Sequence, residues 1–167
     1  LESLAEARES NRHTHYKVDI VDRPAIDAIL ASFRPDAILH LAAESHLDRS
    51  IDDPENFIMT NITGTYRLLA VYHEYLLETC RLHDADCRFL HVSTDEVFGS
   101  LDAEQNAFHE HSPYAPNSPY SASKAAADHL AVSIGGLDGD DAHAAAALDR
   151  VVRGRRALAV AALADGE

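Results

Sequence analysis

The stretch Arg88–Gly99, RFLHVSTDEVFG, decides how the rest of the chain is interpreted. Residues 88–92 alternate between apolar and β-prone side chains, which predicts a buried strand. The strand stops at Ser93-Thr94-Asp95-Glu96, a run of two hydroxyls and two adjacent carboxylates. Ligands of open α/β sheets bind just beyond the carboxyl ends of the strands. We therefore expect this polar run to form part of a functional site.

A second polar cluster follows at residues 118–124, SPYSASK. Tyr120 and Lys124 are four residues apart, so a helix places them on one face. An ammonium beside a phenol favours the phenolate and lowers the pKa of the tyrosine, which can then accept a hydroxyl proton. Taken alone, this spacing also fits the start of an amphipathic helix with a surface lysine. The hydroxyls of Ser93 and Thr94 at a strand end favour the interpretation as a site.

The paired carboxylates Asp95 and Glu96 have two interpretations of their own. Two neighbouring carboxylates can divide an acid/base task when their environments separate their pKa values. A solvated loop with a turn-forming aspartate is the simpler alternative. In combination with Tyr120 and Lys124, we favour an acid/base role.

The remaining elements alternate between strand and helix patterns up to about residue 133. Apolar runs predict strands, proline following a capping aspartate predicts helix starts, and apolar residues at helical spacing predict the helices. Gly64, inside the long helix, suggests close packing or room for a ligand. The order β-α-β-α-β-loop-α predicts an α/β fold with a parallel sheet and flanking helices. The predicted elements are a strand at Tyr16–Ile20, a helix from Asp22-Arg23-Pro24 to Arg34-Pro35, a strand at Asp36–Ala43, a long helix from Asp52-Asp53-Pro54 to Leu82–Asp86, the strand at Arg88–Val92 and a helix from Ser118.

The sequence changes character in its last part. Gly135–Asp141 is typical of a turn or linker, and Ala142–Ala164 is rich in alanine and arginine and lacks aromatic residues. No strand pattern is evident there, and helix and disorder both fit the composition. We therefore predict a first domain over residues 1–133 and a linker with a tail over residues 134–167.

Composition narrows the class of partner. The 167-residue chain carries a net charge of −14 and has a pI near 5.0, which argues against nucleic acid and anionic membranes as partners. No apolar run is long enough for a transmembrane helix. The opening LESLAEARES does not resemble a signal peptide, and we expect the chain to start within a domain. Two cysteines without a metal-type spacing favour a reduced, cytoplasmic setting. We expect no metal site, with His109 and His111 as an exposed loop pair.

Four motifs together resemble a known family. HLAAESHLDRS (40–50), TNITGT (60–65), HVSTDEVFG (91–99) and YAPNSPYSASKAAADH (114–129) are similar to the extended short-chain dehydrogenase/reductase superfamily, and within it to the dTDP-glucose 4,6-dehydratases. The resemblance covers roughly residues 1–130. It implies a Rossmann-like fold, NAD as the cofactor and a nucleotide-activated glucose as the substrate. Sugar-nucleotide 4-epimerases of the superfamily usually carry Ser-Ser-small where this chain has Ser93-Thr94-Asp95-Glu96.

The resemblance also implies roles for the catalytic residues. Tyr120 would be the base for oxidation at sugar C4, with Lys124 holding the ribose and lowering the tyrosine pKa. Glu96 would take the C5 proton and Asp95 would protonate the departing C6 hydroxyl. Thr94 would hydrogen-bond near O4. Hydride would return to C6, giving a 4-keto-6-deoxy sugar nucleotide.

The resemblance implies a set of binding residues as well. Ser45 would reach the substrate in addition to the cofactor, and Asp19 and Ile20 would flank the adenine. The implied cofactor contacts are Asp19, Ile20, Leu41, Ala42, Ala43, Glu44, Ser45, Thr60, Ser93, Tyr120 and Lys124.

The chain also departs from the family pattern. It contains no GxxGxxG turn of the kind that seats a pyrophosphate on a helix N-terminus. We expect the first β-α-β unit and the substrate domain to be missing. The isolated chain is accordingly expected to be weakly active or inactive. The alternatives are a non-catalytic α/β module that binds or dimerises, with a homodimer expected in either case, and a sister 4-epimerase.

Overall fold

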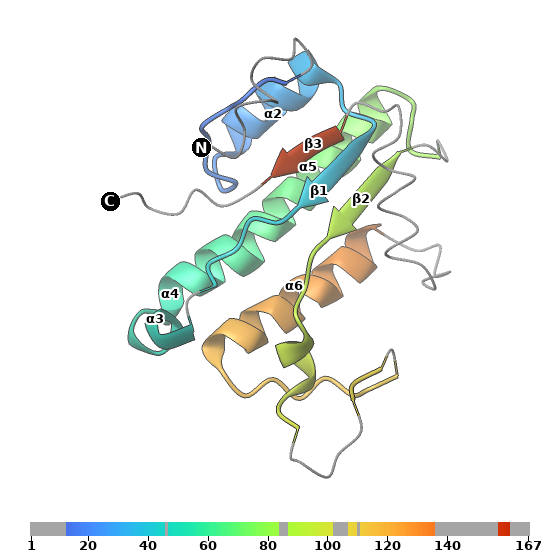
Figure 1. Cartoon of the computed structure of the whole chain (residues 1–167). Helices are drawn as coiled ribbons and strands as arrows, with labels where there is room; N and C mark the ends of the chain where they lie inside the picture. The colour runs from blue at the N-terminus through green and yellow to red at the C-terminus, as the bar shows by residue number, and fades with distance from the viewer. Residues whose placement is uncertain are drawn as a thin grey trace.

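A three-stranded parallel sheet forms the centre of the fold (Figure 1). The computed structural model describes residues 13–45, 47–83, 87–101, 107–109, 111–135 and 157–160. The strands are β1 (Ala37–His40), β2 (Arg88–His91) and β3 (Ala157–Val160), in the order β2-β1-β3. Ala37 of β1 lies opposite Arg88 on one side and Ala157 on the other. The carboxyl ends of the three strands therefore share one edge of the sheet.

Helices flank this sheet, which confirms the predicted fold class. Figure 1 shows α4, η2 and α5 continuing into one another as a long rod that crosses the sheet, with α6 beside it. The π-helical segment η2 joins α4 to α5 without a break in the chain. The helical elements are α2 (Arg23–Phe33), α3 (Leu47–Asp52), α4 (Pro54–Phe57), η2 (Ile58–Gly64), α5 (Thr65–Glu78), the 3-10 turn η3 (Asp95–Phe98) and α6 (Pro119–Gly135).

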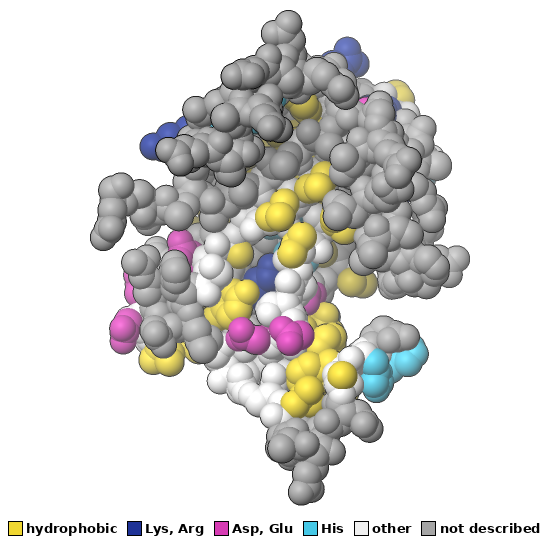
Figure 2. All heavy atoms as spheres, in the orientation of Figure 1, with side chains coloured by type: hydrophobic (Ala, Val, Ile, Leu, Met, Phe, Trp, Pro, Cys, Tyr) yellow, Lys and Arg dark blue, Asp and Glu magenta, His cyan; other side chains and the backbone are white. Residues whose placement is uncertain are grey.

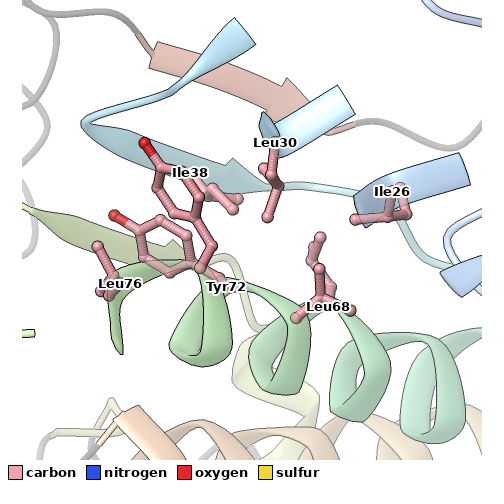
Figure 3. Close-up of a cluster of buried hydrophobic side chains, with 8 residues drawn as sticks. Ile26, Leu30, Ile38, Leu68, Tyr72 and Leu76 are labelled. Carbon is pink, nitrogen blue, oxygen red and sulfur yellow. The ribbon is translucent and has the colours of Figure 1, made fainter. Parts of the chain in front are cut away.

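The apolar core lies where α2 and α5 meet β1 (Figure 3). Leu30 of α2, Ile38 of β1 and Leu68 of α5 are at most 1% exposed and point toward one another. Burial of apolar surface is the main favourable term in folding. This apolar core, as we call it below, comprises Ile26, Leu30, Ile38, Leu68, Val71, Tyr72, Tyr75 and Leu76.

Helix α2 begins and ends as its sequence predicts. The Asp22 carboxylate caps the helix by accepting a hydrogen bond from the Ala25 backbone N–H at 3.2 Å, and Pro24 lies in the first turn. At the other end Arg34 adopts a left-handed backbone with φ of 53°, and Pro35 follows. The residue before a proline avoids the helical region, so the helix stops here.

The strand predicted at Tyr16–Ile20 does not form, and that prediction is wrong. Residues 16–19 have no regular structure, and Ile20 begins a turn. The Asp19 carboxylate accepts a hydrogen bond from the Val21 backbone N–H at 2.9 Å, and the Asp19 carbonyl accepts one from Asp22 N–H. Aspartate often bonds its own backbone two residues on, which competes with strand formation.

The long helix after Pro54 forms but ends earlier than the predicted Leu82–Asp86. Helix α5 stops at Glu78 because Cys80 takes a left-handed backbone with φ of 56°. Arg81 N–H then bonds the Leu76 carbonyl at 2.7 Å, and Cys80 N–H bonds the Leu77 carbonyl. This pair of bonds is a Schellman motif, here built on cysteine instead of glycine.

Two expectations about strands also need correction. Strand β1 covers only Ala37–His40, and the predicted residues beyond it, 41–43, have no regular structure. Strand β3 at Ala157–Val160 was not expected, because ALAV has no alternating pattern and only one β-branched residue. It pairs with β1, and Leu41 N–H bonds the Val160 carbonyl at 2.7 Å. Leu158 and Val160 also pack against the apolar core, so β3 joins the sheet through backbone bonds and side-chain packing.

Several expectations fall outside the described residues. The opening segment and the linker at Gly135–Asp141 lie outside them, apart from the backbone of Gly135. The domain boundary at residue 133 stays a prediction. Among the helices that the structure describes, none is both long and apolar enough to cross a membrane.

Candidate active site

The polar run after β2 folds into the 3-10 turn η3. Thr94 caps this turn, with its hydroxyl accepting a hydrogen bond from Glu96 N–H at 3.3 Å. Asp95 is exposed and Glu96 is half-buried, while the next side chain, Val97, is 1% exposed. Val97 therefore anchors the turn in the fold and leaves the two carboxylates at its surface. Figure 2 shows acidic side chains in the middle of this face, beside a basic side chain that lies deeper.

The segment before α6 packs directly on η3. Ala115 N–H bonds the Val97 carbonyl at 3.0 Å. Gly99 has φ of 98°, and a Cβ at this position would lie 2.8 Å from the Ala115 carbonyl oxygen. Glycine permits both this backbone conformation and this close approach. The start of α6 is therefore held next to the carboxylates of η3.

Two serines fix the first turn of α6, which carries Tyr120. Ser121 N–H bonds the Ser118 hydroxyl at 3.0 Å, and Ser118 N–H bonds the Ser121 hydroxyl at 3.0 Å. This reciprocal arrangement satisfies N–H groups that a helix start leaves open. The half-buried Tyr120 ring packs edge-on against Phe57 of α4, with the ring centroids 6.3 Å apart.

Lys124 lies one turn later and is buried at 4% exposure. Its ammonium donates to the Val92 carbonyl, just after β2, at 2.6 Å. Burial lowers the pKa of Lys124, and the Asp128 carboxylate opposes this shift. The alternative of a surface lysine is therefore wrong.

The pKa of Tyr120 shifts in the opposite direction from the sequence expectation. Its pKa is raised, mainly because burial disfavours the phenolate, and Glu96 and Asp95 raise it further. Hydrogen bonding with Thr94 acts against this shift. Lys124 does not contribute a lowering effect, and its ammonium donates to the Val92 carbonyl. The four-residue spacing of Tyr120 and Lys124 therefore did not predict the direction in which the Tyr120 pKa shifts.

The loop after β1 is attached to the same region by Asn61 of η2. The Asn61 side-chain oxygen accepts from Glu44 N–H at 2.8 Å, and its amide donates to the Glu44 carbonyl at 3.0 Å. The amide also donates to the Ser123 hydroxyl at 2.8 Å, which in turn donates to the Tyr120 carbonyl at 2.7 Å. One buried amide thus connects the predicted cofactor loop with the turn that carries Tyr120.

The other predicted cofactor residues surround this connection. Of the loop, Leu41 and Ser45 are exposed, Ala42 is buried, and Ala43 and Glu44 are half-buried. Thr60 precedes Asn61 in η2 and is half-buried.

Asp19 and Ile20 lie in the turn before α2, where Ile20 is 5% exposed. A Cβ on Gly64 of η2 would lie 2.5 Å from the Ile20 side chain, so the turn packs directly on this helix. Arg67 donates to the Val21 carbonyl and ties the turn to α5 as well. Gly64 therefore serves close packing, with Ile20 as its neighbour.

The described residues contain no group of three or more His, Cys, Asp or Glu side chains arranged to hold a metal. His109 and His111 are both exposed, and their ring centroids are 6.1 Å apart. This pair matches the exposed loop pair that the sequence predicts.

Sequence reasoning missed Asn61 and Asp128. Asn61 lies within the motif TNITGT (60–65), in which the sequence predicts a cofactor contact only at Thr60. Asp128 is 8% exposed and accepts hydrogen bonds from His91 of β2, Ser93 and Tyr114. The available signal was its spacing, four residues after Lys124 on the same helix face.

Comparison with known proteins agrees with the family resemblance of the sequence motifs. The family model described as GDP-mannose 4,6 dehydratase matches residues 1–142. The dTDP-glucose 4,6-dehydratase of Neisseria meningitidis is 50% identical over 130 residues, covering 78% of this chain and 37% of that protein. The Salmonella typhimurium enzyme of the same name is 49% identical over 138 residues, which cover 78% of this chain and 38% of that enzyme. The chain thus spans little more than a third of the length of these curated relatives.

Solved structures give the same relationship. DesIV, a dTDP-glucose 4,6-dehydratase from Streptomyces venezuelae solved with NAD bound, superposes with a TM-score of 0.65 at 40% identity, covering 78% of this chain and 36% of that one. The UDP-glucose 4-epimerase of Thermus thermophilus, also in complex with NAD, superposes with a TM-score of 0.63 at 27% identity. The match covers 75% of this chain and 39% of that one. With the family model matching most of its residues, this chain belongs to the GDP-mannose 4,6 dehydratase family and resembles its dTDP-glucose 4,6-dehydratases.

Proposed function

We propose that this site serves the NAD-dependent dehydration of dTDP-glucose to a 4-keto-6-deoxy sugar nucleotide. The observation that carries the proposal is the packing of η3 against the first turn of α6. Through this packing Thr94 hydrogen-bonds with the Tyr120 phenol, and the negative charges of Asp95 and Glu96 raise the pKa of that phenol. A phenol with two carboxylates beside it provides the three proton-transfer groups that a dehydration needs.

The residues at the sheet edge suit NAD. Lys124 offers an ammonium with three N–H donors, one of which the Val92 carbonyl accepts. The backbone of the loop after β1 is fixed by Asn61, so its position does not depend on a ligand. Bound NAD would supply the hydride acceptor, which no side chain of this chain provides. We propose that Asp19, Ile20, Leu41–Ser45, Thr60, Ser93, Tyr120 and Lys124 form the chain's share of the cofactor site.

Each catalytic residue has a distinct task in this proposal. Tyr120 accepts the proton of the sugar C4 hydroxyl, and Thr94 holds the nearby oxygen. The C4 hydride would pass to bound NAD, which leaves C4 as a ketone. Glu96 removes the C5 proton and Asp95 donates a proton to the leaving C6 hydroxyl, so water departs. The hydride would then return to C6 and a proton to C5. Lys124 binds the ribose, and Ser45 contacts the substrate. The raised pKa of Tyr120 means that its phenol starts protonated at neutral pH, so we expect turnover to increase with pH.

We also propose a homodimer in the cytoplasm. Among the residues that the structure describes, Cys80 and Cys87 are not joined in a disulfide, which suits a reducing compartment. For the domain organisation we propose an NAD-binding unit over residues 1–133 and a separate linker and tail over residues 134–167, from which β3 joins the sheet.

The test measures NAD binding and keto-sugar formation in matched variants. The 167-residue chain is titrated with NAD by calorimetry, alongside Tyr120→Phe and Lys124→Met. Because the sequence predicts weak turnover for this chain, formation of the keto sugar is measured in a graft. The matching 130 residues of the Neisseria meningitidis relative are replaced by those of this chain. We expect saturable NAD binding, and keto-sugar absorbance in the graft that Tyr120→Phe and Glu96→Gln abolish.

Two results would contradict the proposal. One is a folded graft that forms no keto sugar, which would mean that these side chains do not support dehydration. The other is equal turnover by the Glu96→Gln graft, which would remove the proposed base at C5. A product with inverted C4 and an intact C6 hydroxyl would identify a 4-epimerase instead.

A further inference from the structure

Asp128 of α6 accepts hydrogen bonds from three side chains that lie in β2, directly after β2 and in the loop before α6. Its Oδ2 accepts from the Ser93 hydroxyl at 2.6 Å and from the Tyr114 hydroxyl at 3.1 Å. Its Oδ1 lies 3.0 Å from His91 Nε2, which donates to the carboxylate. Asp128 as a residue is 8% exposed. Three donors from three separate positions in the sequence thus converge on one buried carboxylate.

These donors all belong to segments that carry the site. Ser93 directly precedes Thr94, and His91 ends β2. Tyr114 precedes Ala115, whose N–H bonds η3 at the Val97 carbonyl. Asp128 itself lies on the helix that carries Tyr120 and Lys124, one turn beyond Lys124.

Burial of a carboxylate is costly, and an apolar side chain of similar size would often give equal or higher stability. Packing alone therefore does not account for an aspartate here. What aspartate adds is a negative charge one helical turn from the buried Lys124 ammonium, which this charge favours electrostatically, together with acceptors for three donors. Both properties act on residues of the candidate site.

We propose that Asp128 is the positioning residue of this site, holding the backbone that carries Thr94–Glu96 against α6 and serving as the counter-charge of the Lys124 ammonium. The inference rests on the proposed function, because it assigns Asp128 to the same site. It also makes a claim about Lys124 that can be measured without any ligand.

Other titratable groups also face this pair. His91 on β2 and Tyr114 in the loop before α6 contact Asp128 directly. His40 on β1 interacts electrostatically with Lys124 and lies tilted against His91, with ring centroids 5.3 Å apart. A titration of Lys124 must therefore be compared between variants that retain these three groups.

The chain is well suited to such a titration because it contains only two lysines, Lys17 and Lys124. Protein labelled with carbon-13 at the lysine side chains gives two Cε signals, and Lys17→Arg identifies them. Lys17 is exposed and serves as an internal reference. The variants are Asp128→Asn, which keeps the shape and removes the charge, Asp128→Glu, which keeps the charge, and Ser133→Ala as a control on the same helix.

We expect the Lys124 titration midpoint to fall by about one pH unit in Asp128→Asn, since an opposite charge nearby stabilises the ammonium. Lys17 should not change in any variant, and Lys124 should match the parent in Ser133→Ala and Asp128→Glu. An unchanged Lys124 midpoint in folded Asp128→Asn overturns the inference. If Asp128→Asn does not fold, as judged by circular dichroism, Asp128→Glu decides, and a shifted midpoint there overturns the inference.

NAD binding separates this inference from the proposed function. With the function correct, Asp128→Asn should raise the Kd for NAD about tenfold, while Ser133→Ala leaves it unchanged. A parent-like Kd in Asp128→Asn would overturn the positioning role. If the parent chain binds no NAD at all, the cofactor proposal fails for this chain, and the lysine titration still decides the role of Asp128.

Discussion

Two packed faces of the molecule differ in their side-chain chemistry. The apolar core between α2, β1 and α5 consists of aliphatic and tyrosine side chains. Where α6 meets β2 and the end of the sheet, polar side chains surround two buried charged residues, Lys124 and Asp128. We call this second face the polar seam, and it comprises His91, Ser93, Tyr114, Lys124 and Asp128.

The difference shows how the chain divides stability from function. Apolar burial is non-directional and tolerates small shifts, so it suits a face that only has to hold together. Hydrogen bonds to buried ionised groups are directional and add little net stability, yet they fix side chains in one arrangement. The polar seam therefore suits a face that must present Tyr120 and Glu96 in fixed positions. Substitutions in the apolar core should mainly lower the free energy of unfolding. Substitutions in the polar seam should mainly weaken NAD binding.

The largest effect on stability is expected in the apolar core. Leu68→Ala removes a side chain that is 0% exposed and leaves a cavity between α5 and its neighbours. We expect the free energy of unfolding to fall by about 2–5 kcal/mol. Urea unfolding followed by circular dichroism measures this loss. Leu77→Ala on the same helix, where the side chain is 49% exposed, is the matched control and should change stability by no more than about 0.5 kcal/mol.

The second-largest expected effect is a pH dependence of stability that originates at His40, where the two faces meet. This residue of β1 is 1% exposed, and its Nε2 lies 2.8 Å from the Thr65 hydroxyl. Burial, with smaller contributions from His91 and Lys124, lowers its pKa from 6.5 to about 3. Below pH 6.5 the unfolded chain therefore binds a proton that the folded chain does not bind. Stability attributable to His40 is complete above pH 6.5 and declines as the pH falls toward 3.

We expect this decline to be roughly 1–2 kcal/mol between pH 6.5 and 5. Urea unfolding at a series of pH values measures it in the parent and in His40→Gln, which keeps an amide partner for Thr65 but cannot titrate. The slope should be smaller in His40→Gln, and the same replacement at exposed His83 is the control. Equal slopes in the parent and His40→Gln would show that acid sensitivity originates elsewhere.

Lys124→Met tests the polar seam directly. The substitution keeps a long side chain but removes a charge that is 4% exposed, and it leaves the Val92 carbonyl without this donor. The Val92 carbonyl loses a donor and the buried Asp128 carboxylate loses its counter-charge, while the relieved burial of the ammonium and the three hydrogen bonds that Asp128 keeps offset part of this loss. We therefore expect the free energy of unfolding to fall by about 1 kcal/mol. NAD binding should weaken at least tenfold, by about 1.4 kcal/mol. A large loss of stability with unchanged NAD affinity would reverse the assignment of the two faces.

The two faces also differ in how far the sequence predicts them. The apolar core follows from local patterns, because Ile26, Ile29 and Leu30 recur at helical spacing and Asp22 with Pro24 marks the helix start. The motif positions of Thr94, Tyr120 and Lys124 were likewise evident in the sequence. The raised Tyr120 pKa was not, because it depends on burial and on charges that lie on another element.

Other failures have the same origin in long-range contacts. Strand β3 forms by backbone pairing with a distant segment, and nothing in ALAV itself requires it. Asn61 and Asp128 form hydrogen bonds across 62 and 37 residues of sequence respectively, so their partners cannot be predicted from local patterns. Conversely, the strand expected at Tyr16–Ile20 had local β propensity, and the turn formed by Asp19 prevailed over it.

The smallest expected effect tests the contact between Gly64 and Ile20, next to the apolar core. In a helix, alanine is favoured over glycine by up to about 1 kcal/mol. Here a Cβ at residue 64 would lie 2.5 Å from the Ile20 Cδ1 atom, and Ile20 is 5% exposed. Ile20 must therefore move, and overpacking of this kind costs about 1–3 kcal/mol. We expect Gly64→Ala to destabilise the parent by about 1 kcal/mol. In the Ile20→Ala background the obstacle is gone, so the same substitution should become stabilising. A double-mutant cycle from urea unfolding measures this change of sign, and additive effects would mean that the contact at Gly64 does not limit the packing of η2.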